Sequence, residues 1–144
     1  MKAKKSLSYE EMNALPLYEQ AIARENERHR ARLKEIEHMR AALRMLDAER
    51  PAIKAAGQEL YAEHISRAPF SGPLTYSPMF LGPGLLAALL LNKWKVTERG
   101  TGPYPSHTLK KGRLQLRVAC LHVDTLEKAE ALAFPDRHGN GVSL

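Results

Sequence analysis

Apolar positions along the first half of the chain predict one long amphipathic helix, over about residues 16–50. They recur every three or four residues at both ends of this stretch, as on one buried stripe of a helix. The apolar positions are Leu15, Tyr18, Ile22, Leu33, Ile36, Met39, Leu43 and Leu46. At 1.5 Å per residue the helix would be roughly 50 Å long. Pro16 suits its first turn, where no amide donor is needed, and Ser8 with Glu11 predicts a capping box upstream.

The apolar stripe fails at the centre of this helix. Positions seven residues apart form one seam, which consists of Leu15, Ile22, His29, Ile36 and Leu43. Residues 23–34 around His29 contain five cations and two carboxylates. Such a segment cannot leave water unless its charges find partners. We therefore expect the middle of the helix to stay in water. Leu33, Ile36 and Leu43, in the apolar stretch that follows it, are expected to pack inside the protein.

Pro51 predicts the end of this helix or a kink in it, because the residue before a proline is driven away from helical angles. A second helix is expected over 51–67, with Ile53 and Leu60 on its apolar stripe. The two helices then form either an antiparallel hairpin or a bent rod. We favour the hairpin, because the apolar stripe over residues 33–46 needs a nearby partner.

The second half of the chain mixes element types. Residues 84–93 are apolar on every side and predict a short buried helix, whereas 74–81 and 94–99 predict extended segments. Residues 112–123 alternate strictly at their start and give the clearest strand. A long loop over 100–112 joins the last two, and Asp124 is expected to cap a final helix.

These elements predict a helix-rich α+β protein with a small antiparallel sheet. Proline and glycine concentrate after "RAPFSGP" at 67–73, which marks a linker or turn. We expect a helical hairpin or bent rod over residues 1–67 and a compact α+β lobe over 68–144, which together form one cooperative unit.

Composition narrows the setting of the protein. The chain has 144 residues, 44% of them hydrophobic and 26% charged, which is typical of a globular domain. Its net charge of +6 makes nucleic acid or an acidic protein face plausible partners. A single cysteine, Cys120, permits no internal disulfide and suits a reducing cytoplasm. No secretory signal and no membrane span are expected, since the longest apolar run, 81–91, is too short to cross a bilayer.

No catalytic, metal-binding or cofactor motif is present in the sequence. Cys120 and His122 would share one strand face, but a metal site lacks its third ligand there. The paired carboxylates lie among cations on a predicted surface helix, where nothing would raise a carboxyl pKa for acid–base work. We therefore expect no enzyme, no metal and no cofactor. An active site assembled from isolated residues, for example His107, His122 and Asp124, stays open as a third interpretation.

The centre of the long helix is the leading candidate for a binding site. We expect the charged residues Glu25, Arg28, His29 and Arg32 to make charge-paired contacts at a wet interface, with a protein partner or a second copy of the chain as in a coiled coil. The small size and the helix rich in arginine, alanine and leucine are also similar to accessory or inhibitor proteins of phages and mobile elements. That likeness is one of composition, and no motif carries it.

The alternative is nucleic-acid binding by a basic ribbon over residues 93–117. Its candidate residues are Lys93, Lys95, Arg99, Lys110, Lys111 and Arg113. Only Glu98 opposes them, and cations on a ribbon can follow a phosphate backbone while Tyr104 stacks on a base. The simpler interpretation is that Lys95 and Arg117 occupy the solvent-facing positions of a half-buried sheet, with Trp94 in its core.

Overall fold

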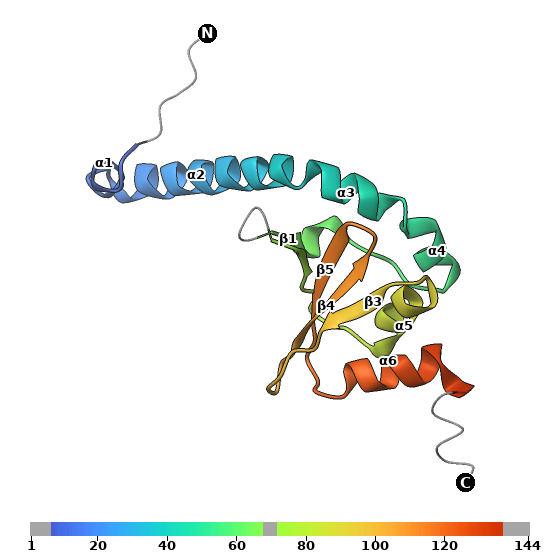
Figure 1. Ribbon diagram of the computed structural model, residues 1–144. Coiled ribbons are helices and arrows are strands. Elements are labelled where there is room, and N and C mark those ends of the chain that lie inside the picture. The colour runs from blue at the N-terminus through green and yellow to red at the C-terminus, as the bar shows by residue number, and fades with distance from the viewer. Residues whose placement is uncertain (1–6, 68–71, 137–144) are drawn as a thin grey trace. The chain divides into compact units, whose positions relative to one another are not determined.

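The computed structural model describes residues 7–67 and 72–136, and its architecture is helix-rich α+β, as the sequence predicted (Figure 1). The chain divides into two compact units, Met1–His38 and Met39–Leu144. This division lies well before the boundary expected at 67/68. The reason is that strand β1 (Ile65–Ser66) pairs with β2 (Leu74–Tyr76), so the sheet itself crosses the expected boundary.

The first unit consists of the short helix α1 (Tyr9–Asn13) and the long helix α2 (Leu17–His38). The predicted capping box is confirmed: the Glu11 amide donates to Ser8 Oγ at 3.1 Å, and the Ser8 amide donates to Glu11 Oε1 at 3.2 Å. Gln20 Nε2 donates to the carbonyl of Asn13 at 3.2 Å, which ties the end of α1 to the start of α2. The α1–α2 corner is therefore held by local polar contacts.

The second unit begins with helices α3 (Arg40–Asp47) and α4 (Arg50–Ala55), so the predicted helix over 16–50 is interrupted at Met39 and again at 48–49. The helix predicted over 51–67 is wrong beyond residue 55. Gly57 has φ +81°, its amide donates to Lys54 O at 2.9 Å, and the Gln58 amide donates to Ile53 O at 3.1 Å. These bonds form a Schellman motif, which ends α4 at a left-handed glycine.

A five-stranded sheet with the order β1-β2-β5-β4-β3 organises the second unit. Its remaining strands are β3 (Lys95–Glu98), β4 (Ser106–Lys111) and β5 (Leu114–Ala119). The sheet is mixed, not purely antiparallel as expected, because β2 runs parallel to β5. Strand β4 lies where a long loop was expected, and it pairs with β5 along its whole length.

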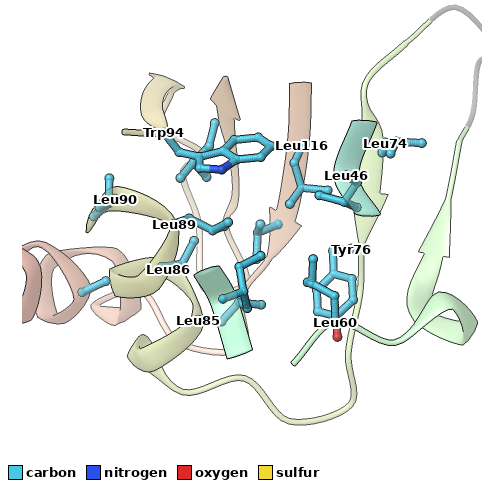
Figure 2. Close-up of a cluster of buried hydrophobic side chains, with 14 of the residues drawn as sticks. Leu46, Leu60, Leu74, Tyr76, Leu85, Leu86, Leu89, Leu90, Trp94 and Leu116 are labelled. Atoms are coloured by element: carbon cyan, nitrogen blue, oxygen red, sulfur yellow. The ribbon is translucent and has the colours of Figure 1, made fainter. Parts of the chain in front are cut away.

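One face of the sheet is covered by the core, to which α5 (Pro83–Leu91) and α6 (Thr125–Ala133) contribute. Figure 2 shows Leu86 and Leu89 of α5 in the same buried cluster as Leu116 of β5, and all three are fully buried. The alternation predicted for β5 is confirmed, since Leu116 is buried while Gln115 is exposed. The opposite face of the sheet therefore carries polar side chains.

Candidate functional site

Helix α2 has no buried residue along its 22 positions. Five large apolar side chains on it are exposed. Leu17, at 83%, lies on a different side of the helix from the other four, which are Tyr18 at 75%, Ile22 at 47%, Leu33 at 53% and Ile36 at 39%. Their spacings of 4, 11 and 3 residues place them on one face of the helix. The expectation that Leu33 and Ile36 pack inside the protein is therefore wrong, whereas Leu43 does pack against the core of the second unit.

We call this face the α2 seam, defined as Tyr18, Ile22, Glu25, Asn26, His29, Leu33 and Ile36. A helix face of this kind ordinarily packs on another element. The local contacts that hold α2 lie elsewhere, for example Arg24, whose guanidinium stacks over the ring of Tyr9 at 5.6 Å. The seam is therefore an apolar surface with a polar centre, and it is open in the described structure.

The predicted partner-binding residues lie at and beside the polar centre of the seam. Arg28 Nη1 and Glu25 Oε1 are 2.6 Å apart, and both side chains are largely exposed, at 76% and 64%. His29 is exposed as well. Arg32 is half-buried and forms an ion pair with Glu35, a partner that we had not assigned to it. The structure thus brings Glu25 and Arg28 together and directs Arg32 to a different carboxylate.

The basic ribbon is divided between free and paired cations. Arg99 forms an ion pair with Glu130 at 2.5 Å, and Lys111 forms one with Glu49 at 2.7 Å. Glu49 also accepts the indole N–H of Trp94 at 3.0 Å, which places Lys111 in a structural network. Two of the six predicted nucleic-acid-binding residues therefore help to hold the second unit together.

Lys95 and Lys110 are different, because they lie directly opposite each other on β3 and β4. Both are exposed, and the side chain of neither makes a hydrogen bond or ion pair within residues 7–67 and 72–136. Like charges in this relation destabilise a sheet. We call them the basic strand pair. Arg113 is exposed at the turn after β4, where Gly112 has φ +60°.

Lys93 occupies an unusual backbone conformation at the end of α5. Its φ is +72°, the one positive value among the described residues other than glycine. Its amide donates to Leu90 O at 3.2 Å and the Trp94 amide donates to Leu89 O at 3.1 Å, which is a second Schellman motif. Glycine is the usual residue there, because a Cβ is disfavoured in left-handed geometry.

A groove of about 620 Å³ lies beside Lys93, between the end of α5, β3 and α6. Its apolar lining includes Leu91, Val96 and Phe134, and the cations at it are Lys93, Lys95 and Arg99. A second hollow of about 410 Å³ is lined by Tyr61, His64 and Tyr76 and by the loop that carries Met79 and Phe80. Phe80 is 84% exposed. We did not single out this loop, because a lone Met-Phe pair between prolines gives no periodic signal.

The isolated residues considered for catalysis have different environments. His107 is buried, and its Nδ1 accepts the Gly100 amide at 3.1 Å while its Nε2 has no partner among the described residues. Burial lowers the pKa of His107, and the nearby Arg99 charge lowers it further. His122 is exposed, while burial raises the pKa of Cys120 to about 11. Within the described residues, no cluster of three His, Cys, Asp or Glu side chains is placed to hold a metal.

In the described part of the chain, no helix is both long enough and apolar enough to cross a membrane. Comparison with known proteins adds no functional assignment: no family model matches the chain, and no curated protein or solved structure matches it significantly. Function must therefore be inferred from the two exposed surfaces, the α2 seam and the basic strand pair.

Proposed function

We propose that this chain is a non-enzymatic binding module that engages a protein through the α2 seam, in the cytoplasm. The observation that carries the proposal is the exposure of four large apolar side chains on one face of a helix without a buried residue. Contiguous apolar surface of this kind is typical of interaction sites. A helix that lays such a face on a partner is a recurring mode of protein recognition.

The polar centre of the seam would set specificity in this interface. Glu25 and Arg28 already form an ion pair in solvent, and such exposed pairs contribute little to stability. At the centre of a contact they would favour partners of complementary charge and reject others. The apolar ends of the seam would supply affinity.

The test compares three chains: the wild type, the double variant Ile22→Glu/Ile36→Glu, and the control Ala31→Glu on the far side of α2. Each is used as bait in a lysate of its source cell, and its mass in solution is measured. We expect the wild type and the control to share an association, with another protein or with themselves, that the double variant loses. Identical bound proteins and identical masses for all three would contradict the proposal. Circular dichroism checks that the helix is retained.

A second candidate function, nucleic-acid binding, is favoured by the basic strand pair. Two unpaired lysines placed opposite each other cost stability, and a phosphate bound between them would remove that cost. We expect Lys95→Gln/Lys110→Gln to weaken DNA or RNA binding and to flatten its salt dependence, whereas Lys54→Gln on α4 leaves both unchanged. Absence of binding at low salt would exclude this function.

A further inference from the structure

The apolar residues of the α2 seam have nearly the same spacing in both chain directions. From this spacing we infer that the partner of the seam is a second copy of the chain in antiparallel orientation. We place a two-fold axis perpendicular to the helix, between Glu25 and Asn26. Each residue of one copy then lies level with a residue of the second copy, and the two residue numbers add up to about 51. Tyr18 then lies level with Leu33 of the second copy. This inference rests on the proposed function, because it names the partner of the same surface.

The apolar positions match in this arrangement. Tyr18 meets Leu33, and Ile22 meets His29, a ring that offers an apolar face and a polar edge. Ile36 meets Leu15, which is half-buried in the turn before α2. Each exposed apolar residue of the seam thereby covers another ring or aliphatic group, and the interface repeats itself about one two-fold axis, as an isologous dimer requires.

The charges also select the antiparallel orientation. Glu25 and Arg28 lie on the same side of the seam, three residues apart. In the antiparallel dimer the two Glu25 side chains meet beside the axis, and Arg28 of each copy lies on the same side within about two residues' rise of Glu25 of the other. The two cations then flank and neutralise the two carboxylates. In a parallel, in-register dimer the two Glu25 side chains would also meet, but Arg28 of the second copy would lie at the opposite edge of the interface. The carboxylates would then lack a cation from the second copy, which disfavours that arrangement.

The expected dimer is weak, because its contact is short and has a polar centre. Helix α2 spans 22 residues, about 33 Å at the usual rise. One helix face of this length buries less than the roughly 800 Å² per partner of a standard interface. We therefore expect a reversible dimer with micromolar affinity, whose formation depends on protein concentration.

Disulfide trapping tests the orientation directly. Asn26→Cys places a thiol on the seam next to the proposed two-fold axis, and Glu27→Cys, the control, places one a single residue away on the far side of α2. The native Cys120 is buried and its pKa is raised to about 11, so it should not compete. With oxidised glutathione as the oxidant, we expect rapid covalent dimers from Asn26→Cys and few from Glu27→Cys.

A mixture of Tyr18→Cys and Leu33→Cys chains distinguishes the two orientations. The antiparallel dimer predicts disulfides between the two variants, while a parallel dimer predicts disulfides within each variant alone. Equal trapping of Asn26→Cys and Glu27→Cys, or trapping within Tyr18→Cys alone, would overturn the inference.

Sedimentation of the wild type over a range of concentrations separates failure of this inference from failure of the proposed function. A concentration-dependent mass that Ile22→Glu/Ile36→Glu abolishes supports the second copy. A strict monomer overturns the second copy as partner. If that monomer still captures another protein through the seam, the binding function stands; if it captures none, both proposals fail.

Discussion

Helices α2 and α5 are both built largely from good helix formers, yet they differ sharply in burial. Six of the nine residues in α5 are buried, whereas none of the 22 in α2 is. Helix α5 is apolar on every side and is stabilised by the core around it. Helix α2 is held by its own backbone hydrogen bonds and by the contacts at the α1 corner, and its exposed ion pairs add little. A helix held locally can keep an apolar face free for a partner, and a helix held by packing cannot.

The largest difference between the two helices should appear when a leucine is truncated. Leu89→Ala in α5 removes a fully buried side chain and should lower the free energy of unfolding by about 2–5 kcal/mol. Leu33→Ala in α2 removes a side chain that is 53% exposed and should change it by less than about 0.5 kcal/mol. Denaturant unfolding of dilute protein measures both. Equal losses would show that Leu33 is buried in solution.

Removing a carboxylate should also cost more stability in the second unit than on α2. Glu49 accepts hydrogen bonds from Trp94 and Lys111, so Glu49→Gln should cost about 1.5 kcal/mol of unfolding free energy. Glu25→Gln breaks only a solvent-exposed pair with Arg28 and should cost less than about 0.5 kcal/mol. Denaturant unfolding at low and at high salt compares the two variants. A larger cost at Glu25 than at Glu49 would contradict the contrast.

Acid should weaken the second unit through His107. Burial and the Arg99 charge lower the pKa of this histidine in the folded protein, so the unfolded chain binds the proton more readily. Stability is therefore complete above the ordinary histidine pKa of 6.5 and falls as the pH drops below it. Unfolding curves between neutral and mildly acidic pH measure this loss. His107→Gln should reduce the slope, and a slope unchanged in this variant would contradict the role of His107.

The two Schellman motifs allow a reciprocal exchange within one molecule. Lys93→Gly relieves a left-handed lysine and should raise the unfolding free energy by about 1 kcal/mol. Gly57→Lys introduces the same strain at an open position, where a Cβ has no atom within 4 Å, and should lower it by a similar amount. Thermal unfolding compares the two. If Lys93→Gly destabilises the protein, the Lys93 side chain contributes more to the fold than its backbone costs.

Sequence patterns anticipated the elements whose periodicity is strong. The all-round apolar run predicted the buried helix α5, and strict alternation predicted β5. Strand β4 was missed because three successive residues, His107, Thr108 and Leu109, are all buried, so no alternation shows. The end of α4 at Gly57 was missed, because one glycine in the sequence does not show that its backbone will adopt a positive φ and end the helix.

Contacts between residues far apart in the chain could not be predicted, for a different reason. The ion pair between Glu49 and Lys111 joins residues 62 positions apart, and the parallel register of β2 on β5 is set by the common core. The pattern on α2 revealed an apolar stripe but not whether the chain itself would cover it. The four candidate residues, Glu25, Arg28, His29 and Arg32, do lie on α2. Leu33 and Ile36 beside them were expected in the interior and are exposed.

Hydrogen exchange of the α2 amides at low and high protein concentration tests the central claim most directly. If the α2 seam binds a second copy, residues 18–36 gain protection as the concentration rises, because association suppresses opening of the helix, while α5 is unchanged. Protection of α2 that stays the same at every concentration, in a chain that remains monomeric, would contradict the account.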